Sequence, residues 1–227
     1  MNKKKVLVIV AHPDDEVLGC GGTIAKHKDL GDYVTVLIMS DGVNSRDEKF
    51  KSESIDERRA CAKQANSILK VDDLSFLSFP DNKMDTVPLL EVIKSIENKM
   101  TELCPDIVYT HSLSDLNIDH CVVHNASITA CRALPGQSVH QLLFFEVPSS
   151  TEWRPSASNN NFNPNWFSDI SDTLDLKLQA LSAYEKELHE FPHPRSLIAV
   201  DVSQNGVVPV LVCWPLKPLN LEERSFR

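Results

Sequence analysis

The amino-acid sequence predicts an α/β fold, a Rossmann-like doubly wound and mostly parallel sheet with helices on both faces. Apolar runs typical of strands alternate along the chain with longer helical patterns. Several of these runs are apolar at successive positions, which is typical of strands covered by helices on both sides. Polar stretches follow four of the strands, at the sheet edge where ligands bind in such folds.

The expected strands are rich in Val, Ile, Leu and Phe, residues that favour buried strands. They lie at 5–10, 33–40, 73–79, 106–111 and 141–147. Helical periodicity predicts helices at 16–30, 54–69, 87–103, 121–134 and 171–189. A stretch rich in Ser, Asn and Pro at 149–165 predicts a long loop over the carboxyl ends of the strands.

Length and composition predict one globular domain spanning residues 1–227. The chain is 42% hydrophobic and 24% charged, values that are ordinary for a folded protein. Its formal net charge of −9 argues against nucleic acid or an anionic membrane surface as the main partner, since both require a basic surface. A small anionic substrate stays possible, because a few local arginines are enough to bind one.

The N-terminal sequence predicts a cytoplasmic protein without a membrane span. MNKKKVLVIV begins like a signal peptide, but His12-Pro13-Asp14-Asp15 interrupts the apolar run and no small-residue cleavage site follows. No apolar run approaches the ~20 residues that cross a bilayer. The six cysteines are dispersed and form no C-x-x-C pair, which indicates reduced thiols.

The first predicted strand ends in a histidine followed by three carboxylates, at Asp14, Asp15 and Glu16. His12 and Asp15 are three residues apart on a tight turn, so both can face one point and form half of a tetrahedral metal site. Asp14 must then project differently, where it can accept a proton from water activated by the metal. Without a cation, these clustered acids would repel one another.

A further metal ligand is expected after the fourth strand. The sequence NIDHCVVH places His120 at the start of a helix and His124 one turn later on the same face. Both histidines could bind a metal, as in the paired histidines of zincin helices. A second-turn histidine is more often structural, however, so both readings of His124 stay open.

The segments AHPDDEVLGCGGTIA and DLNIDH resemble the LmbE/PIG-L family of zinc-dependent de-N-acetylases, and the resemblance extends from Lys5 to about Arg195. The resemblance implies hydrolysis of the acetamide of an N-acetylglucosamine-type sugar. It also implies one Zn²⁺ per chain, held by His12, Asp15 and His120, with Asp14 as the general base. Another divalent metal would also suit a site with two histidines and one aspartate.

Residue 117 departs from the family pattern, which has a histidine at this position. Asn117 can donate a hydrogen bond to an oxyanion, but it cannot supply a proton to the leaving amine. The general acid could then be Asp14 after it has been protonated, or His111 or His193. We favour Asp14, with His193 assisting.

A narrower resemblance concerns the substrate. EVPSSTEW, FNPNWFSDI and FPHPRS resemble an LmbE subgroup associated with bacterial surface polysaccharides and sugar nucleotides. This implies an N-acetylated amino sugar, free or linked to a nucleotide or lipid, and is compatible with a homo-oligomer. The family's substrate-binding arginine matches Arg58, with Arg59 as the alternative. The other expected substrate contacts are Asp41, Asp81, Asn82, His111, Glu146 and Arg195.

The C-terminal sequence, about 196–227, is atypical of that subgroup. It reads NGVVPVLVCWPLKPLNL where relatives usually continue with Trp-Gly or Arg-Gly and end near Ala-Glu-Ala-Phe. Codons for 205–219 can be chosen so that a shifted frame restores that ending. We therefore hypothesise a frameshift in this region, which the nucleotide sequence would test.

Two other function classes were considered. The glycines at Gly19, Gly21 and Gly22, with Asp41 after the second strand, suggest dinucleotide binding, but HPDDEVL separates them from the strand and the spacing fails. The second is a catalytically inactive sugar-binding relative that retains the metal site, suggested by Asn117 and the atypical C-terminus. Zinc content and acetate release distinguish these classes from an enzyme.

Overall fold

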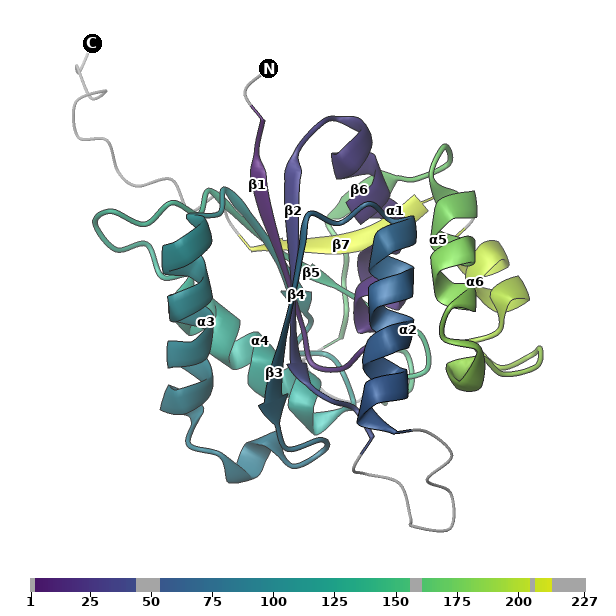
Figure 1. The fold of residues 1–227 in the computed structure, drawn as a ribbon, viewed down its shortest axis with the longest axis horizontal. Helices are drawn as coiled ribbons and strands as arrows, with labels where there is room; N and C mark the ends of the chain where they lie inside the picture. Colours follow the sequence, from purple (N-terminus) through teal and green to yellow (C-terminus); the bar gives the residue numbers. More distant parts are fainter. Residues whose placement is uncertain (1–2, 44–53, 156–160, 205–206, 214–227) are drawn as a thin grey trace.

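A computed structural model gives the structure of the chain and describes residues 3–43, 54–155, 161–204 and 207–213. One seven-stranded sheet runs through it in the order β3-β2-β1-β4-β5-β7-β6 (Figure 1). The strands from β3 to β5 are parallel, whereas β7 is antiparallel to β5 and β6. The strands are β1 Lys5–Val10, β2 Tyr33–Ser40, β3 Asp73–Phe79, β4 Ile107–His111, β5 Gln141–Phe145, β6 Trp166–Asp169 and β7 Val207–Cys213.

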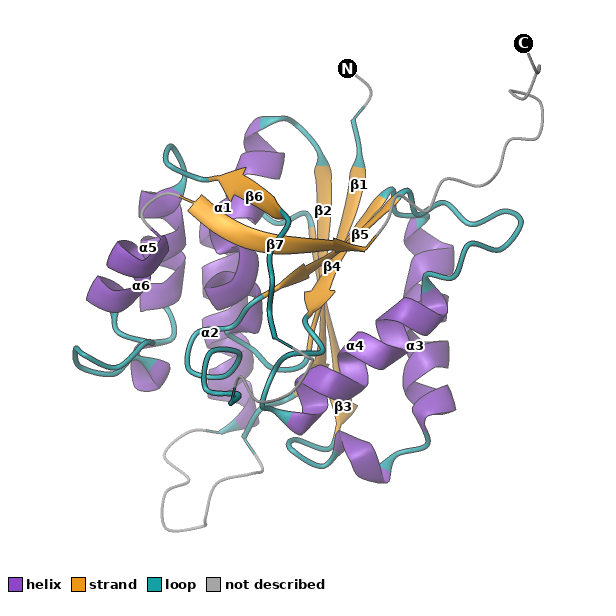
Figure 2. Cartoon of the chain, turned by 180° about the vertical axis from the view of Figure 1, so that it is seen from behind, coloured by secondary structure: helices purple, strands orange, loops and turns teal. Residues whose placement is uncertain are grey.

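Helices cover both faces of this sheet, as predicted. In Figures 1 and 2, α3 and α4 lie on one side of the strands and α1, α2, α5 and α6 lie on the other. The α-helices are α1 Asp15–Asp29, α2 Ile55–Ile68, α3 Leu89–Leu103, α4 Ile118–Ala130, α5 Leu174–Ser182 and α6 Leu197–Gln204. The described residues also contain two short 3₁₀ helices, η2 Met84–Thr86 and η3 Glu185–Glu187. The predicted α/β class and doubly wound arrangement are confirmed.

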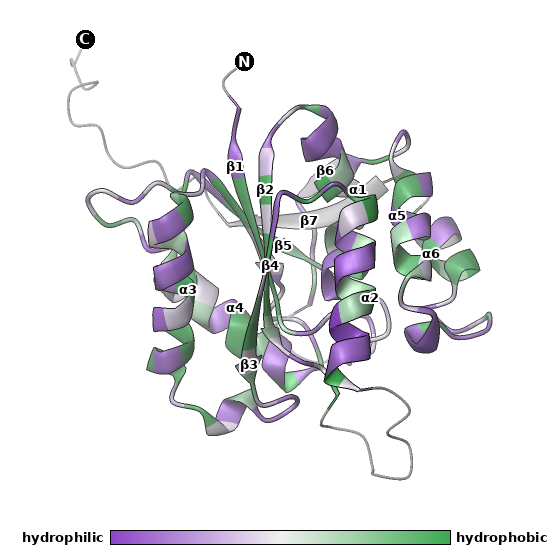
Figure 3. Cartoon of the chain, in the orientation of Figure 1, coloured by the Kyte–Doolittle hydropathy of each residue, from purple (hydrophilic) through white to green (hydrophobic). Residues whose placement is uncertain are grey.

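The central strand β1 belongs to two hydrophobic cores at once. Val6, Val8 and Val10 pack into the core beneath α1, α2 and α5, while Leu7 and Ile9 pack into the core beneath α3 and α4. This alternation is the period of two residues expected for a strand. Figure 3 shows the result, with apolar strands at the centre and polar outer faces on the helices. A strand buried on both faces can carry polar groups only where it ends.

The chain direction changes between β1 and β4, and this positions the site. Both strands are parallel neighbours, but the chain continues from β1 to β2 on one side and from β4 to β5 on the other. Ligands bind at such a switch point, outside the carboxyl ends of the strands. The turn after β1 and the segment after β4 therefore meet at one edge of the sheet.

Two predicted helices differ from the structure, and two strands were not predicted. The single helix expected at 171–189 is wrong, because α5 ends at Ser182 and the chain turns to bury Tyr184. The helix expected from residue 121 begins at Ile118 instead, because the Asn117 side chain accepts a hydrogen bond from the Asp119 N–H (2.8 Å) and caps it. The short antiparallel strands β6 and β7 were not expected at all.

The C-terminal region contains α6 and β7. Residues 205–206 and 214–227 lie outside the described residues, so most of the segment of the frameshift hypothesis does too. Among the described helices, none combines the length and apolar character needed to cross a membrane.

The glycines of the GCGG segment serve helix packing. Gly19 and Gly22 lie inside α1. A methyl group at Gly19 would overlap the fully buried ring of Phe145, and one at Gly22 would lie 2.6 Å from the Ile170 side chain. These glycines allow α1 to approach β5 and the start of α5, which accounts for the glycine cluster without a dinucleotide.

We expect Gly19→Ala to lower the free energy of unfolding by about 1–2 kcal/mol. The overlap of the added methyl with the Phe145 ring should cost about 2–3 kcal/mol, and the higher helix propensity of alanine offsets about 1 kcal/mol of this cost. Urea unfolding measures the difference. Exposed Lys63 on α2 supplies the control, since Lys63→Ala should change stability by less than about 0.5 kcal/mol. Equal stability of Gly19→Ala and wild type would contradict the packing role.

Candidate metal centre

The turn after β1 is held by its own side chains. The Asp15 carboxylate accepts a hydrogen bond from the His12 N–H (2.9 Å), and the Glu16 carboxylate accepts one from the Asp14 N–H (3.0 Å). Asp14 caps α1 with a φ of 106°, in the left-handed region that usually requires glycine. These bonds keep the strained turn in place, so that Asp14 and Asp15 project in different directions.

Three side chains from two distant segments converge beside this turn. Asp15 Oδ2 lies 3.4 Å from His12 Nδ1 and 3.2 Å from His120 Nε2. The two histidine nitrogens are 3.3 Å apart. Ligands about 2.1 Å from a tetrahedral metal are separated by roughly 3.4 Å. The three atoms therefore fit one divalent cation, and these are the residues that the sequence predicted.

Each of the two histidines also faces a carboxylate through its other ring nitrogen. His12 Nε2 lies 3.0 Å from Asp119 Oδ2 and 3.2 Å from Asp81 Oδ1. His120 Nδ1 lies 3.0 Å from Asp115 Oδ2. Such carboxylate–histidine pairs orient metal-binding histidines and are typical of real metal sites. The carboxylates that face His12 and His120 therefore fit a metal site, as do the three candidate ligands themselves.

These outer carboxylates are anchored in turn. Asp119 accepts hydrogen bonds from the backbone N–H groups of Asn82 (2.6 Å) and Met84 (2.9 Å). Asp115 accepts hydrogen bonds from the side chains of Ser150 and Thr151, the latter at 2.8 Å. The loops after β3 and β5 thus fix the rings of the two histidines.

The charges of the cluster are strongly coupled. Burial would lower the pKa of His120, but the Asp15 and Asp115 carboxylates raise it to about 9. Burial also opposes protonation of His12, yet hydrogen bonds to Asp119, Asp15 and Asp81 raise its pKa well above the ordinary value. Burial would raise the pKa of Asp15, but His120 and His12 hold it well below its usual range. The carboxylates of this cluster therefore favour positive charge at the positions of His12 and His120.

The other two histidines considered lie behind the ligand atoms. His111 is fully buried, stacks on His120 with ring centroids 3.9 Å apart, and accepts a hydrogen bond from the Ala11 N–H through Nε2. Burial, and then His120, lower the pKa of His111 well below its ordinary value. His124 is hydrogen-bonded through Nδ1 to the His111 carbonyl (2.8 Å), the arrangement of a structural histidine.

Asp14 lies between two arginines. Its Oδ2 accepts hydrogen bonds from Arg58 Nη2 and Arg195 Nη1, both at 3.1 Å. Arg58 also donates to the Pro13 carbonyl (2.8 Å) and pairs with Glu187 (2.7 Å). Burial raises the pKa of Asp14 and the two guanidinium groups lower it, with the balance above its ordinary value. The arginines predicted to contact substrate thus also orient this carboxylate.

A small polar pocket of about 120 Å³ opens beside these groups. It is lined by His12, Asp14, Asp15, Gly42, Arg58, Asp81, Asn82, Asn117, His120, Glu187 and Arg195. The structure therefore brings most of the predicted site residues to one place. Ligand pockets usually measure about 300–1,000 Å³, so this one has the size for a functional group of a substrate.

Four predicted site residues do not line this pocket. His111 lies behind it, as described above. Asp41 pairs with Arg59 (2.7 Å), the alternative substrate arginine. His193 packs between Trp153 and His189, and its Nδ1 accepts a hydrogen bond from the Arg195 N–H (3.1 Å). Glu146 lines a separate pocket on the other side of Asp115.

The sequence analysis did not assign a role to Asp115, Asp119, Glu16 or Glu187. Asp115 and Asp119 flank His120 in the DLNIDH segment, and this density of acids around a predicted ligand could have indicated them. Glu16 holds the turn through the Asp14 N–H, and its other oxygen accepts a hydrogen bond from the Tyr184 hydroxyl (2.6 Å). The position of Glu187 beside Arg58 depends on the turn after α5, which no local pattern predicts.

The sequence of this chain matches a known protein family. The family model described as PIG-L, GlcNAc-PI de-N-acetylase, matches residues 7–131. A protein of Escherichia coli strain K12, described as uncharacterized deacetylase YaiS, is 31% identical over 191 residues, covering 81% of this chain and 92% of its own length. The chain belongs to the PIG-L (LmbE-like) family.

Two further relatives carry a more specific description. The diacetylchitobiose deacetylase of Thermococcus kodakarensis is 30% identical over 194 residues, covering 82% of this chain and 71% of that protein. The solved structure of N,N'-diacetylchitobiose deacetylase from Pyrococcus horikoshii superposes with a TM-score of 0.75 at 21% identity, covering 97% of this chain and 89% of that one. This structural likeness supports the same fold.

We expect His12→Ala and His120→Ala each to lower zinc affinity by at least about a hundredfold, because each removes one of three protein ligands. Zinc content after dialysis, measured by elemental mass spectrometry, tests this. His124→Ala is the matched control and should retain zinc, since its ring bonds the backbone instead. Full zinc occupancy in His12→Ala would overturn the ligand assignment.

We expect Asp115→Asn to lower zinc affinity by about 10–100-fold while the fold is retained. The substitution removes the charge that faces His120 Nδ1 but keeps a side chain of the same shape. Competition with a chelator measures the affinity, and circular dichroism checks the fold. An unchanged affinity would show that Asp115 serves only the loop after β5.

Proposed function

We propose that this protein is a metal-dependent hydrolase that removes the N-acetyl group from an N-acetylglucosamine-type sugar or sugar conjugate. The convergence of His12 Nδ1, Asp15 Oδ2 and His120 Nε2 at 3.2–3.4 Å is the observation that carries the proposal. Membership of the PIG-L family and the two diacetylchitobiose deacetylases among its relatives support it. The products would be acetate and a free amino sugar.

His12, Asp15 and His120 would hold the cation, which we expect to be Zn²⁺. When bound, such an ion lowers the pKa of water and polarises a carbonyl group. The buried carboxylates Asp81, Asp115 and Asp119 keep the two imidazoles oriented.

Asp14 is the proposed general base. It lines the pocket beside Asp15 but points to Arg58 and Arg195, and so it is free of the ligand cluster. Its carboxylate would accept the proton of the attacking water and then return it to the leaving amine. A pKa raised toward the working range favours both transfers.

Two groups in the pocket can donate to the oxyanion formed at the acetamide carbon. Asn117 Nδ2 donates to Asn82 Oδ1 (3.0 Å) and has a second N–H available to substrate. Arg195 also lines the pocket, where its charge would favour developing negative charge. Fixed donors of this kind stabilise a transition state without reorganisation.

We expect Asp14→Asn to keep its zinc but to lose about 10²–10⁴-fold in kcat, because asparagine preserves shape and cannot accept a proton. Acetate release from N-acetylglucosamine and N,N'-diacetylchitobiose measures the rate, and the metal content of the same sample is determined in parallel. Normal turnover by Asp14→Asn would remove Asp14 as the base. Wild-type protein that binds zinc and releases no acetate would instead favour the inactive sugar-binding relative.

A further inference from the structure

A second pocket lies on the other side of Asp115 from the metal centre and is larger than the first. It measures about 340 Å³, within the usual range of ligand sites, and is lined by Ser114, Glu146, Thr151, Glu152, Arg154, Asn161, Phe162 and Asn163. Asp115 separates the two pockets. Its Oδ2 accepts a hydrogen bond from Thr151 Oγ1 (2.8 Å) and faces His120 Nδ1 at 3.0 Å. Only the Asp115 side chain would therefore stand between His120 and Thr151 on the wall of the second pocket.

Several polar groups of this second pocket have no hydrogen-bond partner among the described residues. Glu146 is half-buried, and its carboxylate has no hydrogen-bond partner among the described residues. Arg154 donates from Nη1 to the backbone carbonyls of Leu113 (3.2 Å) and Asp115 (2.6 Å), which fixes its position. Its Nε and Nη2 groups have no recorded partner in the part of the chain that is described. A half-buried carboxylate and a fixed guanidinium with free donors require a ligand that both donates and accepts.

The charge of the lining distinguishes between possible ligands. Glu146 and Glu152 carry two negative charges and Arg154 carries one positive charge, so the pocket opposes an anionic phosphate. Hydroxyl groups, by contrast, donate to carboxylates and accept from guanidinium and amide groups. Phe162 adds an apolar ring to the same wall. This combination suits a neutral, hydroxyl-rich ring.

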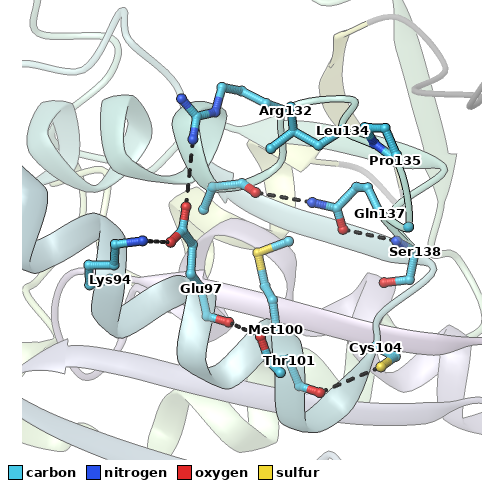
Figure 4. A pocket seen from close by; sticks show the side chains of 12 residues that line it. Lys94, Glu97, Met100, Thr101, Cys104, Arg132, Leu134, Pro135, Gln137 and Ser138 are labelled. Carbon is cyan, nitrogen blue, oxygen red and sulfur yellow. Dashed lines mark hydrogen bonds and ion pairs between the residues drawn. The ribbon is translucent and has the colours of Figure 1, made fainter.

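A third pocket, larger than either of these two, gives a useful contrast. It lies at the C-terminal end of α3, measures about 520 Å³, and is shown in Figure 4. There the charged groups are paired with one another, since Glu97 contacts Lys94 at 2.6 Å and Arg132 at 3.7 Å. It also lies by the N-terminal end of β5, at the opposite edge of the sheet from the metal centre. Nothing there indicates a ligand.

We propose that the pocket around Glu146, Arg154 and Phe162 is a subsite for a neutral saccharide unit linked to the N-acetylated sugar. This inference rests on the proposed deacetylase function and deepens it. The 120 Å³ pocket at the metal centre would bind the acetamido group of the N-acetylated sugar. The 340 Å³ pocket beyond Asp115 would bind the saccharide ring linked to that sugar. The substrate is then an oligosaccharide or glycoside in preference to a nucleotide-linked sugar.

Calorimetric titration of the zinc-loaded protein tests the subsite with three probes: N-acetylglucosamine, N,N'-diacetylchitobiose and UDP-N-acetylglucosamine. We expect the neutral disaccharide to bind at least about tenfold more tightly than the monosaccharide and the nucleotide sugar. Glu146→Gln and Phe162→Ala should each weaken disaccharide binding about three- to tenfold and leave monosaccharide binding unchanged. Glu97→Gln, in the pocket of Figure 4, is the control and should change neither.

Several results would overturn the subsite. These are equal affinity for disaccharide and monosaccharide, absence of disaccharide binding, equal losses for both ligands in the two variants, or tighter binding of UDP-N-acetylglucosamine. Acetate release, measured on the same samples, separates this failure from failure of the proposed function. Selective disaccharide binding without acetate would leave the subsite standing and refute the deacetylase, whereas acetate release without selectivity would do the reverse.

Discussion

The site depends on a group of buried carboxylates that hydrogen bonds and positive charge stabilise together. They follow β1, β3 and β4 and comprise Asp14, Asp15, Asp81, Asp115 and Asp119. Burying an ionised carboxylate costs several kcal/mol unless a counter-charge compensates it. Protonated histidines or a bound cation compensate one half of the group, and two arginines compensate the other. The loops after β3 and β5 add hydrogen bonds to these carboxylates and so help to offset the cost of burying them.

The positions of β1 to β5, and of the turn that carries His12 and Asp15, were predictable because their signals are local. Apolar runs mark the strands, and the spacing of His12 and Asp15 marks the turn. His120 required one further step, namely that parallel strands bring their carboxyl ends to the same edge. The strands and the convergence of these three side chains could therefore be predicted from short segments and topology, whereas their binding of a metal stays a prediction.

The remaining features depend on tertiary contacts that no short segment encodes. Arg58 was expected to face substrate, yet its partners Asp14 and Glu187 come from segments before and long after it in the chain. The predicted helix at 171–189 breaks so that Tyr184 can reach Glu16. β6 is a four-residue strand at the edge of the sheet, and β7 joins it to β5 through antiparallel pairing on both sides.

The proposed proton transfers depend on how the surroundings of Asp14 change the pKa of its carboxyl group. Asn117 cannot hold a proton, so one carboxylate must accept it and return it, and its pKa must allow both. Burial raises the pKa of Asp14, which strengthens this carboxylate as a base, and the charges of Arg195 and Arg58 oppose part of that rise. The two arginines thus help to set the pKa of the one carboxylate that the proposal uses for both proton transfers.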